Sequence, residues 1–317
     1  MRKLVAASLM TFCLLQVGAT AALAQGRAQG FTSLSLFAEP EKDALTPGQP
    51  VTIKVRLTNL TDSVITARRD LDPAYGAVQV YVSLNGGEFK RYLGPGWGTK
   101  DPPAGSSEQI APGDSVTREI TLLFHHALGG RDDLLESSLP LDEIGSYVIR
   151  VELYDETFGR RIVAPAFGVQ AWFPQEEAGQ AIWQAVKDDA KLAYFIQTGD
   201  ARQAADVVRK AEQLIGRYPD NSQEKHLALA LGRYYLAEGK IEAAIGHLKE
   251  ATKAEPASAL HAQALLELTK SYVKKGDVDE ALKISDAAGD EINDGEVRQE
   301  LQRLKSKLRQ GGKSPGP

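Results

Sequence analysis

The sequence predicts a two-part protein, with an antiparallel β-sheet region over residues 30–173 followed by an α-helical region over residues 174–310. The first observation is that apolar residues recur at every second position between Phe31 and Val169, which is the period of half-buried strands. The second is that the period becomes helical after Pro174 and stays so almost to the C-terminus. A chain of 317 residues suffices for about two domains of ordinary size.

The first 24 residues are predicted to form a cleavable signal peptide. They begin with two positive charges, Arg2 and Lys3, continue with a long apolar run, and end in a small-x-small site that suits a signal peptidase. Cleavage before Gln25 would deliver the mature chain to the bacterial periplasm or outside the cell. The alternative is an uncleaved membrane anchor, because the apolar run is about as long as the ~20 residues that span a bilayer.

The composition of the cleaved chain excludes several classes of site. Cleavage removes Cys13 and both methionines, so the mature protein would contain no disulfide and no zinc–thiolate site. The loss of Arg2 and Lys3 would change the formal net charge from −5 to −7. A mildly acidic surface without long basic runs argues against a nucleic-acid partner, whose phosphates require a positive face.

Four alternating runs in the first region predict strands, and each adjoins a turn sequence. The runs are Val51 to Leu57, Val78 to Leu84, Ile120 to Phe124, and Tyr147 to Leu153. The second run ends at Asn85-Gly86-Gly87, whose preference for left-handed backbone suits a hairpin turn. Roughly seven such strands would bury their apolar faces most economically as two packed sheets, although a barrel satisfies the same alternation.

Two segments of this region resemble bacterial immunoglobulin-like modules of exported proteins. They are LTPGQPVTIKVRLTNLTD at 45–62 and GSYVIRVELYD at 145–155. The resemblance implies an immunoglobulin-like β-sandwich over residues 30–173, with adhesion or spacing as its role. It transfers no functional residues to this chain.

The stretch LGRYYLAEGKIEAAIGHLKEATKAEP, at 231–256, resembles a tetratricopeptide repeat, which is a pair of antiparallel helices in about 34 residues. The motif positions are occupied by Gly232, Tyr235, Gly239, Ala244, Ala251 and Pro256. A large side chain at Gly232 would force the two helices apart at a cost of roughly 1 to 3 kcal/mol. Gly239 suits the left-handed end of the first helix.

Two weaker repeats flank this one and complete a short solenoid. One begins near residue 185 and turns at Gly199, and the other begins near residue 262 and turns at Gly276. The earlier repeat departs from the pattern, because Asp188 and Lys191 occupy positions meant for apolar residues. A capping helix is predicted from the apolar stripe Val297, Leu301, Leu304 and Leu308. Residues 311–317 are predicted to be a disordered tail.

The repeat resemblance also implies a groove that binds a partner polypeptide, lined by the first helix of each repeat. The corresponding residues are His226, Leu229, Arg233, Leu236, Gln263, Leu266, Lys270 and Val273. Arg233 and Lys270 would be neighbours and would pair with a carboxylate of an acidic peptide. Leu229 and Leu266 do not reproduce the Lys and Asn with which chaperone-tail binders of this family recognise their ligands. The alternative is that both side chains are solvated on the helix surface and bind no ligand.

We predict no catalytic site, metal site or cofactor. The patterns GxSxG, GxxxxGK[ST] and GxGxxG do not occur. His125 and His126 precede Asp132 and Asp133, but adjacent strand residues point to opposite faces, so a structural role is expected.

One loop offers a second binding hypothesis. The segment LGPGWGTKDPPAG, at 93–105, places Trp97 where an exposed ring would stack on a sugar or anchor a partner. The alternative is that Trp97 folds back over the end of the sandwich. The sequence therefore predicts an exported protein-interaction or assembly module, and secondly a carbohydrate- or envelope-component-binding accessory protein.

Overall fold

The structure is a computed structural model. It describes residues 34–68, 71–100, 107–126, 139, 141, 143–155, 159–201, 205–219, 223–256, 258–288, 292 and 295–311. The chain divides into two units, residues 1–32 and 33–317, and every described residue belongs to the second. The predicted signal peptide and residues 312–317 of the predicted tail lie outside the described residues, whereas residue 311 ends the last helix.

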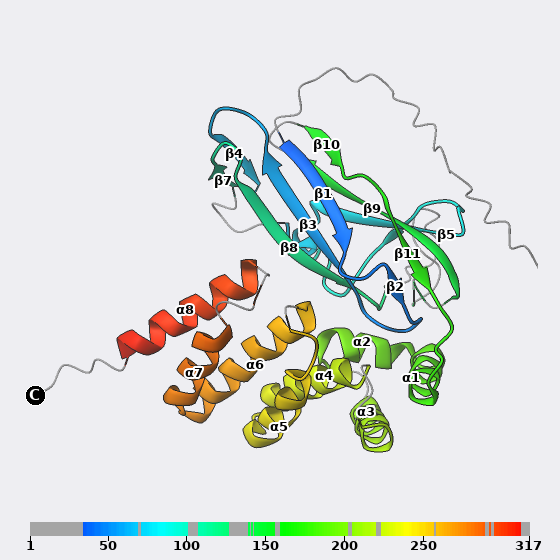
Figure 1. The fold of residues 1–317 in the computed structure, drawn as a ribbon, viewed down its shortest axis with the longest axis vertical. Coiled ribbons are helices and arrows are strands. Elements are labelled where there is room, and N and C mark those ends of the chain that lie inside the picture. Colours follow the sequence, from blue (N-terminus) through cyan, green and yellow to red (C-terminus); the bar gives the residue numbers. More distant parts are fainter. Residues whose placement is uncertain are drawn as a thin grey trace, which may run out of the picture. The chain divides into compact units, whose positions relative to one another are not determined.

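Strands occupy the first part of the described chain and helices the second (Figure 1). The strands are β1 Leu34–Pro40, β2 Ala44–Leu45, β3 Val51–Asn59, β4 Ile65–Arg68, β5 Val78–Leu84, β6 Lys90–Tyr92, β7 Ser107–Ile110, β8 Ser115–Leu122, β9 Gly145–Asp155, β10 Arg160–Val163 and β11 Phe167–Ala171. The described residues thus contain more strands than the roughly seven predicted. The additional ones are short, and a run of two to four residues carries no readable alternation.

The strands form three sheets. Their orders are β1-β3-β8, β2-β11-β9-β5-β6 with β10 also paired to β9, and β4-β7. The pairs are antiparallel except that β2 runs parallel to β11, with Ala44 opposite Gln170 and Leu45 opposite Ala171. This parallel pair departs from the purely antiparallel prediction, and it involves the two-residue strand that the sequence pattern could not reveal.

The predicted alternation is confirmed in the two larger sheets. Ile53 and Val55 of β3 are completely buried, and so are Ile149 and Val151 of β9. Side chains from both sheets join one hydrophobic core. The hairpin between β5 and β6 also has the predicted conformation, since Asn85 and Gly86 have φ angles of 50° and 77°.

The helices are α1 Glu177–Asp188, α2 Ala190–Thr198, α3 Ala205–Arg217, α4 Glu224–Ala237, α5 Ile241–Ala251, α6 Ala259–Lys275, α7 Val278–Ala288 and α8 Gly295–Gly311. The segment predicted to be the first repeat begins with a helix break. Helix α1 ends at Asp188, and Asp189 caps α2 by accepting a hydrogen bond from the Lys191 backbone nitrogen. The polar residues that interrupt the apolar pattern therefore mark a helix boundary. None of the helices in the described part of the chain combines the length and apolarity needed to cross a membrane.

The helical hairpins turn where predicted. Gly199, Gly239 and Gly276 all adopt left-handed backbone, with φ angles of 72°, 75° and 83°. Helix α8 packs on the last hairpin through Val297 and Leu301, which are buried in the predicted apolar stripe.

The end of β8 is bound to the helices. Leu123 packs into a core that contains Phe195 of α2 and Leu227 of α4. The side-chain amide of Gln197, on α2, accepts a hydrogen bond from the Phe124 backbone nitrogen at 2.8 Å and donates one to the Thr121 carbonyl at 2.9 Å. Gln197 thus pairs with the backbone of this segment much as a neighbouring strand would.

Candidate functional site

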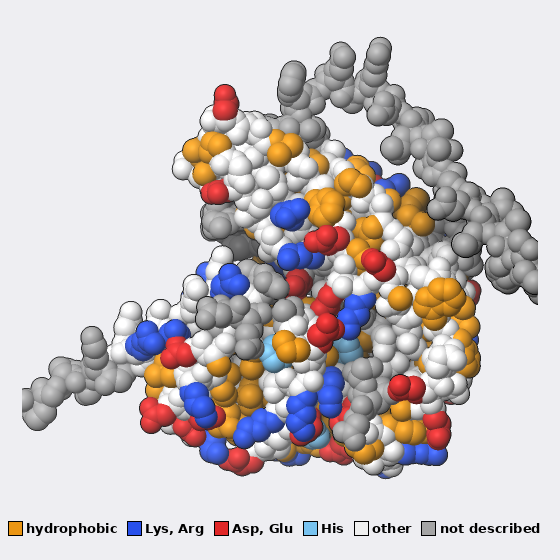
Figure 2. Space-filling model, viewed as in Figure 1, with side chains coloured by type: hydrophobic (Ala, Val, Ile, Leu, Met, Phe, Trp, Pro, Cys, Tyr) orange, Lys and Arg blue, Asp and Glu red, His pale blue; other side chains and the backbone are white. Residues whose placement is uncertain are grey.

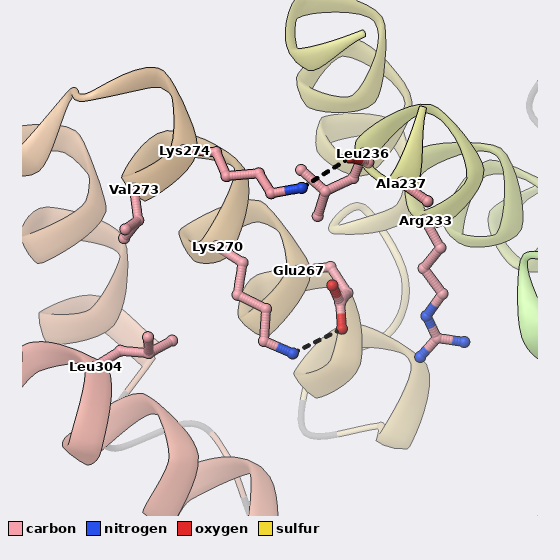
Figure 3. A pocket seen from close by; sticks show the side chains of 8 residues that line it. All are labelled: Arg233, Leu236, Ala237, Glu267, Lys270, Val273, Lys274 and Leu304. Atoms are coloured by element: carbon pink, nitrogen blue, oxygen red, sulfur yellow. Dashed lines mark hydrogen bonds and ion pairs between the residues drawn. The ribbon is translucent and has the colours of Figure 1, made fainter. Parts of the chain in front are cut away.

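Helices α4, α6 and α8 border a cleft of about 480 Å³ (Figure 3). It is lined by Arg233, Leu236 and Ala237 of α4, by Glu267, Lys270, Val273 and Lys274 of α6, and by Leu304 of α8. Helix α6 contributes residues spaced by three or four positions, which places them on one face. The face of the molecule in Figure 2 shows cations and carboxylates interspersed over the helices, with hydrophobic side chains between them.

The polar side chains of the cleft are bonded within the protein. Lys270 forms an ion pair with Glu267 at 3.0 Å. The Lys274 ammonium donates a hydrogen bond to the Leu236 carbonyl at 3.0 Å and so satisfies an acceptor in the last turn of α4. What remains for a ligand is mainly the apolar wall of Leu236, Val273 and Leu304.

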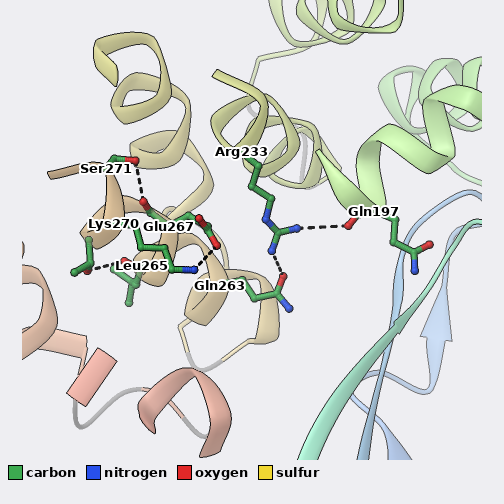
Figure 4. Close-up of polar contacts among 8 residues, drawn as sticks. Gln197, Arg233, Gln263, Leu265, Glu267, Lys270 and Ser271 are labelled. Carbon is green, nitrogen blue, oxygen red and sulfur yellow. Dashed lines mark hydrogen bonds and ion pairs between the residues drawn. The ribbon is translucent and has the colours of Figure 1, made fainter. Parts of the chain in front are cut away.

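Arg233 connects the cleft to the rest of the protein (Figure 4). Its Nη2 donates to the Gln263 side-chain oxygen at 2.7 Å, and its Nη1 lies 3.5 Å from the Gln197 carbonyl. Burial lowers the pKa of Arg233, while Glu267 opposes that shift. The guanidinium stays protonated at any physiological pH, because its ordinary pKa is far above neutrality.

The other end of the predicted groove is covered by the β-sheet region. His226, Leu229, Arg233 and Gln263 line a small cavity of about 30 Å³ together with Pro50, Thr52 and Thr121 of the β-sheet region. Nearby, Glu41 accepts a hydrogen bond from the Ala259 backbone nitrogen at 3.0 Å. A partner polypeptide therefore has no open surface at this end of the groove.

His226 is neutral in this environment. Burial lowers its pKa to about 4, and the positive charges of Lys42 and Arg233 contribute to the shift. Its position against the β-sheet region removes it from the surface available to a partner.

The eight predicted groove residues thus do not form one open surface. Four of them, Arg233, Leu236, Lys270 and Val273, line the cleft, and three lie only in the covered cavity. Leu266 packs instead against a core that contains Val297 and Leu301 of α8. The physical reason is that the β-sheet region fills one end of the groove and the capping helix covers Leu266.

Sequence analysis missed four residues of the cleft as site residues: Glu267, Lys274, Leu304 and Ala237. Glu267 and Lys274 lie three residues before and four after Lys270 on α6. Leu304 was assigned to the capping helix, but the sequence gives no angle at which that helix docks. Helical spacing from Lys270 would have found the first two.

Trp97 folds back on the sheet. Its ring lies 4.9 Å from the Tyr92 ring in an edge-to-face arrangement and packs against the β-sheet core. A Cβ atom at Gly94 would lie 2.7 Å from the Trp97 Nε1, so the close fit requires glycine there. This packing favours the structural alternative over a sugar-stacking Trp97.

The two adjacent histidines lie just after β8 and have different surroundings. His125 is buried, and its Nδ1 accepts a hydrogen bond from the Leu93 backbone nitrogen at 2.8 Å. His126 is exposed, with its ring against Phe124. Asp132 and Asp133 lie outside the described residues. Among the residues that are described, no three His, Cys, Asp or Glu side chains gather to hold a metal ion.

Comparison with protein families identifies part of the helical region. Residues 235–308 match the tetratricopeptide repeat model. This segment contains α5, α6 and α7, most of α8, and the cleft residues Leu236 to Leu304. The match indicates protein–protein interaction as the general role of the helices. No curated protein matches the chain.

Several solved structures are distantly similar. One is the sporulation control protein Spo0M from Bacillus subtilis, at 14% identity and a TM-score of 0.25, where the match covers 50% of this chain and 56% of that one. Another is the CARDB domain of a Pyrococcus furiosus protein, at 13% identity and a TM-score of 0.23, covering 45% of this chain and 96% of the domain. Similarity this low says nothing about the role of the chain.

Proposed function

We propose that this protein is an exported interaction or assembly module, not an enzyme, that binds a partner polypeptide in the cleft between α4, α6 and α8. The tetratricopeptide match over residues 235–308 supports a protein as the partner. We further propose that the strands form an immunoglobulin-like sandwich and the helices a short solenoid. The periplasmic or secreted location rests on the sequence of residues 1–24.

The apolar wall of the cleft carries the proposal. Leu236, Val273 and Leu304 come from three different helices and border one open space. A large apolar side chain of a partner that becomes buried there contributes roughly 1.5 to 3 kcal/mol. Such an anchor is what helical grooves use to hold a peptide segment.

The charges around this wall favour an acidic partner. Arg233, Lys270 and Lys274 outnumber the single carboxylate, Glu267. The Lys270 side chain is 35% exposed, so a partner carboxylate can reach it and replace Glu267 in the ion pair. Because solvent screens an exposed pair, this contact contributes more to specificity than to affinity.

Capture of proteins from the native envelope fraction by the full chain tests the proposal. Lys270→Glu reverses the charge at the cleft and should abolish retention of the captured protein. Lys307→Glu is the matched control, because Lys307 is an exposed lysine of α8 that does not line the cleft. It should retain the protein at the level of the unmodified chain.

Two results would refute the cleft as the binding site. One is equal retention by the unmodified chain and Lys270→Glu. The other is equal loss in both variants, which would mean that capture depends on total charge. Thermal unfolding of each variant establishes that the fold is intact.

A further inference from the structure

The outward face of the second sheet carries a row of side chains that the partner-binding proposal does not use. The strand register places Arg91 of β6 opposite Tyr81 of β5, and Tyr81 opposite Arg150 of β9. Their sequence neighbours Val80, Ile149 and Val151 are buried in the core. Because successive strand residues point to opposite faces, the Arg-Tyr-Arg row points outward.

Arg150 is held rigidly in this row. Its guanidinium carbon lies 4.4 Å from the Phe89 ring centroid and 4.9 Å from that of Tyr81. Stacking between a guanidinium and aromatic rings fixes the plane of the donor groups, which favours recognition of a planar anion.

A carboxylate is already bound on this face. Glu152 is buried, and its two oxygens lie 3.0 Å from the Arg150 Nε and 3.1 Å from the Arg161 Nη1. Two guanidinium groups therefore share one carboxylate, which leaves most of their N–H donors without an anion. The arrangement shows that a carboxylate fits between these arginines.

The face has an excess of positive charge. Among the side chains of this face that the structure describes, Arg91, Arg150 and Arg161 are accompanied by one carboxylate, that of Glu152, on a protein whose formal net charge is −5. Arg161 is exposed and Arg91 is half-buried, so an anion that docks on this face reaches Arg161 first.

Exposed apolar side chains lie beside the arginines. Tyr154 is 44% exposed and stands opposite Arg161, and Val163 is 49% exposed and stands opposite Glu152. A flat face that combines an exposed ring with guanidinium groups matches a sugar ring that carries a carboxylate. The ring of the sugar would pack on Tyr154 while its carboxylate pairs with Arg161.

We propose that this arginine–tyrosine face, made of Tyr81, Arg91, Arg150, Glu152, Tyr154 and Arg161, binds a polysaccharide whose sugars carry carboxylates. The site is separate from the helical cleft and does not depend on it. Arg161 on β10 and Arg91 on β6 are separated by β9 and β5, so carboxylates on different sugars of the polymer engage them across three strand spacings of about 4.8 Å each. Glu152 keeps Arg150 and Arg161 oriented.

Binding of the full chain to immobilised alginate, a polyuronate, at low ionic strength tests the proposal. The double variant Arg91→Gln/Arg161→Gln should bind at least tenfold more weakly, since it removes two charged contacts without truncating the side chains to alanine. Arg56→Gln is the matched control, because Arg56 is an exposed arginine on β3 of the other sheet. It should bind within twofold of the unmodified chain.

Two further polymers distinguish a carboxylated polysaccharide from a neutral polysaccharide and from an acidic polypeptide. Neutral dextran should not bind, and polyglutamate should bind more weakly than alginate. Absence of alginate binding, or equal binding by the double variant, would overturn the proposal. Tighter binding of polyglutamate that is lost in the same double variant would assign the face to an acidic polypeptide instead. Lys270→Glu, in the helical cleft, should leave alginate binding unchanged.

Discussion

Gly232 of α4 lies so close to Leu248 of α5 that a Cβ atom at position 232 would be 2.5 Å from the Leu248 Cγ. Leu248 is completely buried and therefore has no free direction in which to move. The contact explains why a small residue stands at this point of α4 and how α4 and α5 fix their separation.

Gly232→Ala should destabilise the protein by roughly 1 to 3 kcal/mol, because the added methyl group overpacks the helix crossing. Gly246→Ala is the control within the same hairpin, since nothing lies within 4 Å of a Cβ atom there. This second change should raise stability by about 0.5 to 1 kcal/mol through helix propensity. Chemical denaturation measures both. Equal effects of the two substitutions would contradict the close crossing.

Gln197→Glu should loosen the contact between β8 and α2. The carboxylate cannot donate to the Thr121 carbonyl, and it leaves that acceptor unpaired at a cost of about 1 to 3 kcal/mol. Gln213→Glu, an exposed change on α3, should alter stability by less than about 0.5 kcal/mol. Chemical denaturation should show this loss only in the first variant, because the introduced carboxylate can still accept from the Phe124 amide. Equal stability of the two variants would show that the bond to Thr121 does not hold this segment.

His226 should make stability depend on pH. Its folded pKa of about 4 lies below the ordinary value of 6.5, so the unfolded chain binds a proton that the folded chain does not. Stability is therefore full above about pH 6.5 and decreases as the pH falls toward 4, by about 1 to 2 kcal/mol between pH 7 and pH 5. His226→Gln should lose this part of the dependence. Parallel stability profiles for the two proteins, measured by urea unfolding, would contradict the shift.

Trp97→Ala should destabilise the β-sheet region. The indole packs edge-to-face on Tyr92 at 4.9 Å and covers the core beneath it. Its removal should cost about 2 to 4 kcal/mol, a little less than for a fully buried tryptophan. Thermal unfolding measures the loss. A variant with unchanged stability would instead mean that Trp97 is a free loop residue, available to a ligand.

The main features that could be predicted from sequence are those in which apolar residues or turn glycines recur at a regular spacing. The alternation in β3 and the left-handed glycines at 199, 239 and 276 were sufficient to predict strands and helical hairpins. The short strands β2 and β6 could not be predicted, because two or three residues show no period. Their positions depend on pairing with distant strands.

The site was predicted only in part for a related reason. The repeat pattern assigns residues to a groove face, and Arg233, Leu236, Lys270 and Val273 do line one cleft. The pattern contains no information about what covers that face. The docking of β8 on α2 through Gln197, and of α8 over Leu266, arises from contacts between segments far apart in the sequence.

Site-specific photo-crosslinking in the native envelope tests the central claim most directly. A photoreactive amino acid at position 274, on the rim of the cleft, should give one discrete cross-linked product, and Lys270→Glu in the same chain should suppress it. The same amino acid at position 249, on α5 outside the cleft, should not give that product. No product from position 274, or the same products from both positions, would contradict a partner-binding cleft between α4, α6 and α8.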